Sequence, residues 1–552
     1  MNLMGQILFD PLKILFDFFQ KICYNIYVKL KNTYYPLVQE EINVKKEKNK
    51  MPNTLLNGLK QTANIGYTEN GAVKHFTTHS DLLDMYAMGG AYRNRSDDDV
   101  ILMFRKAYQE NPVYALKCLF YLRDVRGGQG ERRFFRVAMR DLAINNKSVA
   151  ERLIEHIPEF GRWDDLYCLV DTPMENEVFA LIKKQLALDV QCKTPSLLAK
   201  WLKSENTSSP ESRALGAKTR KALGMNHKQY RKTLSVLRER INVLERLMSA
   251  GEWDKIEFDK IPSKAGLVYR NAFARRDIIK AKYEAFAKDK DTKVNAEVLN
   301  PVDIAGKIFR YWGPYGTGDV ERAMFQKYWE NLKDYYNGRE ERGIAIVDVS
   351  GSMTGTPMNA AVSMGTYIAE RGKGPFKDHF ITFSHNPKLV KIEGVDIFDK
   401  FQRMRSADWG MNTNIEAVFN MLLATAQRTH CPADEMPETL YIFSDMEFDG
   451  AMTYGDVQRS YSYGYENRLR GEGGVNTLLE KIAQKWAANG YELPRVIFWN
   501  LNARSQNIPA LGGRFSYVSG FSMSAIESVL SGKDGYDLMM DTLNRERYAS
   551  IK

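Results

Sequence analysis

The sequence predicts two architectures in one chain: an α-helical repeat segment, arranged as a solenoid or ring, followed by a doubly wound α/β domain. Three observations lead to this fold class. Apolar residues recur at helical spacing from about residue 81 to 337, and short apolar runs alternate with helical stretches from residue 342 onward. The length of 552 residues also exceeds what one hydrophobic core usually needs.

Composition places the chain among globular proteins, with 44% hydrophobic, 26% charged and 12% aromatic residues. The five cysteines lie far apart with no CxxC pair, which argues against a disulfide framework or a zinc site and favours a reducing, cytoplasmic location. The seven histidines form no HExxH motif.

The first 50 residues differ from the rest of the chain. Residues 7–35 are rich in Phe, Tyr, Ile and Leu, but charges from Asp10 to Lys31 interrupt them, so no transmembrane span is expected. We expect an amphipathic helix and a basic linker at 45–50. This extension either packs on the protein or contacts a membrane surface through residues 1–35. We expect the helical segment at 51–341 and the α/β domain at 342–545.

Helical periodicity is clearest at residues 98–109, 112–122, 132–144 and 227–248, with no strict sequence repeat between them. Successive helices without strands suggest hairpins that bury one another's apolar faces. After residue 342 the expected strands are 343–348, 380–383, 439–444, 495–500 and 517–519, and the expected helices are 358–371, 413–426 and 474–489. This alternation is typical of a mostly parallel sheet.

The run Asp348-Val349-Ser350-Gly351-Ser352 stands where a buried strand ends, which is the ligand-binding edge of an open α/β sheet. Two more oxygen ligands are expected from later strand ends: Thr413, which precedes a helix, and Asp445, which follows the strand at 439–444. Carboxylate and hydroxyl oxygens are hard ligands that suit Mg²⁺ or Mn²⁺. We therefore predict one divalent metal on Asp348, Ser350, Ser352, Thr413 and Asp445.

This set of five residues resembles the metal-ion-dependent adhesion site of von Willebrand factor A domains, matched in order. One departure is Asn414, where many such domains have Asp. The resemblance implies that the metal accepts a carboxylate or similar oxygen from a partner protein. Because both carboxylates are metal ligands and no other general base is evident, we expect binding rather than catalysis.

A second functional feature is basic charge. Residues 193–246 hold 13 Lys and Arg against four Glu, an excess of nine positive charges. Charge on helices usually means solvation, but an excess this large favours nucleic acid. Trp201 and Tyr230 would offer stacking surfaces. The candidate contacts here are Lys218, Arg220, Lys221, Arg231, Lys232 and Arg238.

The stretch 122–133 places four arginines around three glycines before a helix. Such a loop either exposes backbone N–H groups to an anion or is an ordinary turn between helices. The arginines that could pair with phosphate are Arg123, Arg126, Arg132 and Arg133. The stretch 158–166 is expected to form a tight packing corner.

Taken together, the stretches LRDxRGGxGER, PEFGRWDDL, KWLxSE and YRKxLSxLR resemble the TROVE-like domain-of-unknown-function family 2828. Residues 68–72 and 498–502 also match, and the resemblance runs from about residue 55 to 545. The order of domains is distantly similar to the Ro autoantigen family, in which a ring of HEAT-like repeats binds RNA. This likeness implies small structured or single-stranded RNA as the partner.

The leading hypothesis is a non-enzymatic RNA-binding ribonucleoprotein component whose α/β domain binds Mg²⁺. One alternative is a metal-dependent protein adhesion module that does not bind RNA. Another is a metal-dependent nuclease or phosphatase.

Overall fold

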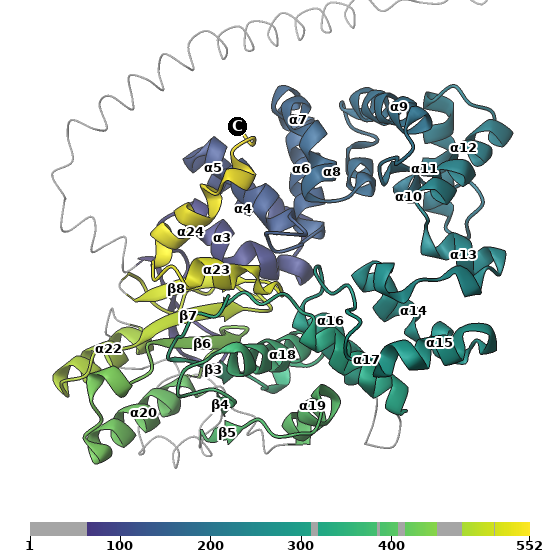
Figure 1. Cartoon of the computed structure of the whole chain (residues 1–552). Helices are drawn as coiled ribbons and strands as arrows, with labels where there is room; N and C mark the ends of the chain where they lie inside the picture. The colour runs from purple at the N-terminus through teal and green to yellow at the C-terminus, as the bar shows by residue number, and fades with distance from the viewer. Residues whose placement is uncertain (1–62, 311–317, 383–386, 407–413, 450–476, 513) are drawn as a thin grey trace, which may run out of the picture. The chain divides into compact units, whose positions relative to one another are not determined.

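A computed structural model of the chain describes residues 63–552 apart from 311–317, 383–386, 407–413, 450–476 and 513 (Figure 1). The predicted extension of residues 1–50 and the predicted metal ligand Thr413 lie outside the described residues. Residues 65–552 form one packed unit, which contains both the helical segment and the sheet.

The helical segment confirms the first half of the predicted fold class. Its helices begin where local sequence favours it: Ser96 forms a capping box with Asp99, and Asn111 caps a helix that starts with Pro112. A 3-10 helix, Trp163–Leu169, lies between α8 and α9. The helices are α3 (Asp81–Met88), α4 (Asp97–Glu110), α5 (Pro112–Arg123), α6 (Arg133–Asn145), α7 (Lys147–Leu153), α8 (Ile157–Phe160), α9 (Glu175–Gln191), α10 (Leu198–Trp201), α11 (Pro210–Ala222), α12 (His227–Arg240), α13 (Leu244–Ala250), α14 (Ser263–Arg275), α15 (Asp277–Lys288), α16 (Pro301–Ile308) and α17 (Asp319–Glu330).

Two details of this segment differ from expectation. The helix predicted at 227–248 is broken into α12 and α13, because Asn242 adopts a left-handed conformation with φ of 49°. Before α3, the strands β1 (Ile65–Tyr67) and β2 (Val73–His75) form an antiparallel hairpin. Three-residue strands are too short for alternation to reveal them in a sequence.

The second half of the fold class is also confirmed. A six-stranded sheet has the order β5-β4-β3-β6-β7-β8, in which only the β4–β5 pair is antiparallel. The short edge strand β5 was not anticipated. The elements are β3 (Gly343–Val347), α18 (Thr356–Arg371), β4 (His379–Thr382), β5 (Leu389–Lys391), α19 (Ile397–Ser406), α20 (Ile415–Thr429), β6 (Thr439–Ser444), α22 (Leu478–Ala488), β7 (Arg495–Asn500), β8 (Phe515–Ser519), α23 (Ile526–Val529) and α24 (Gly535–Leu543).

Both faces of the sheet are buried, and each face belongs to a different hydrophobic core. Successive strand residues point to opposite faces, so Ile344 and Ile346 join a core with α20, α22 and helices α3 to α12. Ala345 and Val347 join a second core with α18, α19 and helices α13 to α17. The sheet therefore serves both halves of the helical segment.

The helical segment contacts the α/β domain at both of its ends. Helix α3 packs on β8, while α16 and α17 pack on α18 and α19, and Figure 1 shows these neighbours side by side. Helices α6 to α13 pack mainly on one another and on adjoining 3-10 turns. The first and last helices of the segment thus contact the α/β domain, and the helices between them do so less.

A buried carboxylate ties the end of α5 to the C-terminal residues. Asp124 is fully buried and accepts hydrogen bonds from Arg547 Nη2 at 2.6 Å and Tyr548 Oη at 3.0 Å. Arg547 Nε also donates to Asp124. Because a buried carboxylate without a cation is costly, this contact fixes residues 547–548 against the helical segment.

Replacing Arg547 with Ala is expected to lower the free energy of unfolding by about 2–3 kcal/mol, somewhat less than for a fully buried pair because Arg547 is 30% exposed. Urea unfolding followed by circular dichroism measures this loss. The control is Lys533→Ala, which breaks an exposed pair with Asp541 and should cost about 0–1 kcal/mol. Equal losses in the two variants would contradict the role given to Asp124.

Candidate functional site

The predicted metal ligands gather where two neighbouring parallel strands end. The register pairs Val347 of β3 with Phe443 of β6, and Asp348 N donates to Phe443 O at 3.0 Å. Asp348 and Asp445 therefore follow adjacent strands at the same edge of the sheet. We call this region, with Ser350 and Ser352, the acidic edge.

Hydrogen bonds within the acidic edge hold Asp348 in place. Its Oδ1 accepts from Ser350 N at 2.9 Å, and its Oδ2 accepts from Ser444 Oγ at 2.6 Å. The hydroxyls of Ser350 and Ser352 lie 3.1 Å apart. Four of the five predicted ligands are thus brought together, and the fifth, Thr413, lies in the undescribed stretch before α20.

Asp445 is the least satisfied member of this group. It is almost fully buried, and its Oδ2 accepts no hydrogen bond from any described residue, although Arg504 Nη2 lies 3.3 Å away. Burial, and then the charge of Asp348, raises the pKa of Asp445 to about 6. Burial also raises the pKa of Asp348. A cation beside both carboxylates would offset these costs.

The residues present fit a small divalent cation. An unsatisfied buried carboxylate oxygen, a second buried carboxylate and two adjacent hydroxyls are the oxygen donors that Mg²⁺ or Mn²⁺ prefers. Among the described residues no group of three or more His, Cys, Asp and Glu side chains is placed to hold a metal. The acidic edge contributes two carboxylates, and its remaining donors are hydroxyls.

The β1–β2 hairpin rests directly beside the acidic edge. Glu69 N donates to the buried Glu447 at 2.8 Å, Asn70 Nδ2 donates to Glu447 O at 2.6 Å, and Thr68 Oγ1 donates to Phe448 O at 2.6 Å. Arg504 links the carboxylates of Glu69, at 2.8 Å, and Asp445. Sequence reasoning assigned these residues no role, although residues 68–72 belong to a matched motif.

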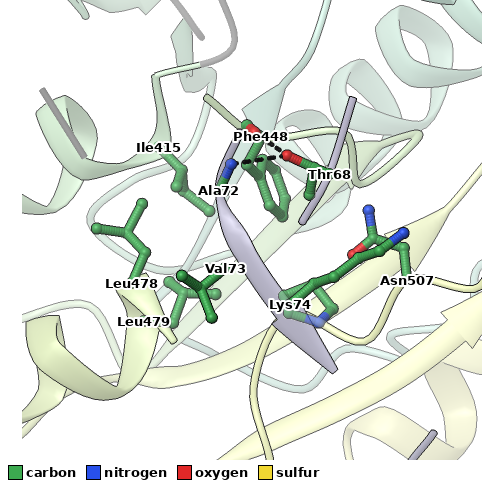
Figure 2. A pocket seen from close by; sticks show the side chains of 10 residues that line it. Thr68, Ala72, Val73, Lys74, Ile415, Phe448, Leu478, Leu479 and Asn507 are labelled. Atoms are coloured by element: carbon green, nitrogen blue, oxygen red, sulfur yellow. Dashed lines mark hydrogen bonds between the residues drawn. The ribbon is translucent and has the colours of Figure 1, made fainter. Parts of the chain in front are cut away.

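Figure 2 shows a small hollow under this hairpin, bordered by Val73, Lys74, Leu479 and Asn507. Lys74 is 4% exposed, and its Nζ donates to Ser505 Oγ at 2.8 Å. Burial lowers the pKa of Lys74, opposed by the nearby charges of Glu447 and Glu69. The hollow is largely apolar, and its polar groups serve to fix the hairpin.

One sequence interpretation proposed that the glycine-rich loop before α6 presents its amides to an anion, but three of these amides are bonded within the protein. The N–H groups of Gln129, Gly130 and Glu131 donate to the carbonyls of Tyr121, Asp124 and Leu122 at 2.7–3.1 Å. A Cβ on Gly128 would lie 1.9 Å from Tyr121 O. The loop therefore caps the C-terminus of α5, and glycine is required for this close approach.

The predicted RNA contacts form three groups: buried side chains, ion-paired side chains and exposed side chains. Arg123 is 2% exposed and donates twice to Asp165, while Arg238 donates to Ala199 O, Leu202 O and Ser204 Oγ. Burial lowers the pKa of Arg238. Both arginines stabilise packing, so neither is available to a phosphate.

A second group is engaged in ion pairs. Arg220 pairs with Glu205 at 2.9 Å, Arg133 with Asp97, and Lys218 with Asp171. The third group is exposed. Lys221, Arg231 and Lys232 make no hydrogen bond or ion pair through their side chains to the described part of the chain, nor does Arg132, and Arg126 donates to Glu159 O.

Of the two predicted stacking residues, Tyr230 is 2% exposed and donates to Lys203 O at 2.8 Å, so it cannot stack on a base. Trp201 is half-buried, and the guanidinium of Arg162 lies 4.1 Å from its ring centre. No helix in the described ranges is long and apolar enough to cross a membrane.

Comparisons with known proteins match two family models to different parts of the chain. Residues 68–196 and 187–338 match the family "Domain of unknown function (DUF2828)", and residues 342–548 match "Domain of unknown function (DUF7788)". The Uncharacterized protein L728 of Acanthamoeba polyphaga mimivirus is 29% identical over 520 residues, covering 86% of each chain. The crystal structure of the Deinococcus radiodurans RO (RSR) protein is similar at 14% identity with a TM-score of 0.36, covering 84% of this chain and 93% of that one.

Burial predicts that two arginines of α12 contribute very differently to the free energy of unfolding. Arg238→Ala leaves three acceptors without their donor and is expected to lower the free energy of unfolding by about 1–3 kcal/mol. Arg231→Ala removes an exposed side chain and should change it by less than about 0.5 kcal/mol. Chemical denaturation of the two variants in parallel measures both values. A large loss for Arg231→Ala would show that it has a packing role.

Proposed function

The helical segment belongs to the DUF2828 family, and on this premise we propose that the protein is a non-enzymatic, RNA-binding component of a ribonucleoprotein. The observation that carries the proposal is the exposed basic face of α11 and α12. Within the described part of the chain its cations have no protein partner, whereas Arg220 of α11 pairs with Glu205 and Arg238 of α12 donates to Ala199 O.

This basic face consists of Lys221, Lys228, Arg231 and Lys232, all exposed and without a side-chain hydrogen bond or ion pair to the described residues. Phosphate oxygens are the ligands that such a group of cations attracts, and counterion release makes the binding depend on salt. Exposed Lys and Arg side chains can contact a phosphate while they keep most of their water. The face therefore suits the backbone of RNA better than a specific base.

The acidic edge has a different role in the proposal. Asp348, Ser350, Ser352 and Asp445, with Thr413, would hold Mg²⁺ or Mn²⁺, and the ion would offer a coordination position to a carboxylate of a protein partner. Both carboxylates are buried among the ligands, and a carboxylate committed to a metal is a poor general base. This supports docking or stabilisation rather than hydrolysis.

RNA binding is tested by reversing three charges, Lys221→Glu, Arg231→Glu and Lys232→Glu, in one variant. Filter binding of a structured and a single-stranded RNA between about 50 and 200 mM salt should show weaker binding, and the slope of log K against log salt should fall by about 2, or 0.7 per lost phosphate contact.

The matched control is the triple variant Lys280→Glu, Lys288→Glu and Lys290→Glu, which makes the same charge change at exposed positions on or next to α15. It should retain most of the affinity. Equal weakening by both variants would mean that net charge alone, and not the basic face, drives binding. RNA cleavage by the wild-type protein would favour the hydrolase alternative.

Metal binding is tested by thermal unfolding with and without Mg²⁺. An ion that binds the folded state at 100 times its Kd stabilises it by about 2.7 kcal/mol, which raises Tm. Asp348→Ala and Asp445→Asn should abolish this increase. Arg504→Gln removes a positive charge 3.3 Å from Asp445 and should strengthen Mg²⁺ binding severalfold. A Tm that is insensitive to Mg²⁺ and Mn²⁺ in the wild type would refute the metal assignment.

A protein partner lost on chelation of Mg²⁺, and retained after nuclease treatment, would instead support the adhesion alternative. The acidic edge would then account for the main activity. The basic face of α11 and α12 would then only be solvated.

A further inference from the structure

Three of the matched sequence stretches meet at one place in the helical segment. Arg132 ends the glycine-rich loop before α6, Arg162 immediately precedes the 3-10 helix Trp163–Leu169, and Trp201 is the last residue of α10. Arg123 and Arg136 complete the group. We call this set of four arginines and Trp201 the arginine corner.

The arginine corner holds more positive than negative charge. Asp165 is fully buried and accepts from Arg123 Nη2 at 2.6 Å and Arg136 Nε at 2.7 Å. Asp164 is 6% exposed and lies 3.0 Å from Arg162 Nε and 3.1 Å from Arg136 Nη2. Two carboxylates thus serve three guanidinium groups.

The fourth arginine increases this excess. Arg132 is exposed, and its side chain has no hydrogen bond or ion pair with the described residues. The pKa of Arg162 is lowered by burial first and also by the charges of Arg132 and Arg123, against the opposing charge of Asp164. Like charges held close together in a half-buried site favour an anion as their missing partner.

A planar surface lies beside these charges. The guanidinium of Arg162 lies 4.1 Å from the ring centre of Trp201, and Lys200 Nζ lies 5.7 Å from it. The hydrogen bond from Arg162 Nη2 to Asp164 at 3.1 Å and the 27% exposure of Arg162 leave the pair fixed but accessible. Nucleobases stack on aromatic rings and on guanidinium planes of this kind.

We propose that the arginine corner binds one nucleotide of single-stranded RNA, with its phosphate against Arg132 and Arg162 and its base stacked on the Trp201–Arg162 pair. An inorganic phosphate or a phosphorylated side chain would use the charges but not the stacking surface, so a nucleotide is the better match. The inference rests on the proposed RNA binding and adds to it a second subsite, distinct from the basic face of α11 and α12.

The direct test uses the full-length wild-type protein and an oligouridine of about twelve nucleotides that carries one photoreactive 4-thiouridine. After irradiation, mass spectrometry should locate the adduct at Trp201 or on the peptides that contain Arg162 and Arg132. Adducts confined to other peptides overturn the proposal, even if RNA binds.

Affinity measurements give an independent readout. Trp201→Ala should weaken binding of oligouridine roughly 5- to 150-fold, the range for loss of one stacked base, while Trp201→Phe should retain most of the affinity. Arg132→Gln should weaken binding and lower the salt slope by about 0.7. The control Arg152→Gln makes the same charge change at an exposed position of α7 and should have no effect.

An abasic strand of the same length separates stacking from charge. Trp201→Ala should not change its affinity, whereas Arg132→Gln should weaken it as it weakens oligouridine. If Trp201→Ala weakens both strands equally, Trp201 has no stacking role and the proposal fails. If the triple variant of the basic face loses binding while the Trp201 and Arg132 variants do not, the proposed function stands and the arginine corner is refuted.

Discussion

The burial of both faces of the central sheet is the constraint on which the rest of the structure depends. A mostly parallel sheet cannot leave either face in water, because its strands are apolar on both sides. Here α18 and α20 alone do not cover the two faces of the sheet. Early helices join the core on the side of Ile344, and late helices join the core on the side of Val347. The helical segment is therefore held at both ends by the same sheet.

This arrangement explains why the acidic edge is surrounded by residues from distant parts of the chain. The first hairpin closes over the loop that follows β6, and its contacts with Glu447 and Phe448 join positions nearly 380 residues apart. Arg504 then lies between Glu69 and Asp445 and supplies a positive charge to a region rich in carboxylates. Any cation that binds there will be coupled to the hairpin through this guanidinium, since the two share Asp445.

Arginine and lysine have several different roles in the helical segment, and packing decides among them. Arg238 and Arg231 lie on the same helix, yet Arg238 donates to three acceptors and Arg231 is exposed without a partner among the described residues. Arg123 and Arg132 flank one loop and show the same contrast. The basic excess of residues 193–246 therefore overstates the positive charge that is exposed and unpaired, because Arg220 pairs with Glu205 and Arg238 donates to carbonyls within the protein.

The sequence by itself determined the fold class, most helices and the core strands of the sheet, because apolar periodicity is a local property of the chain. It also placed Asp348, Ser350, Ser352 and Asp445 together, since the carboxyl ends of parallel strands meet at one edge. The break at Asn242 and the hairpin of residues 65–75 are local features that the apolar pattern did not reveal. The tertiary structure alone decided which arginines are buried against carboxylates and which are exposed. These depend on contacts between residues far apart in the chain, and no local pattern encodes which cation will find a buried carboxylate and which will face water.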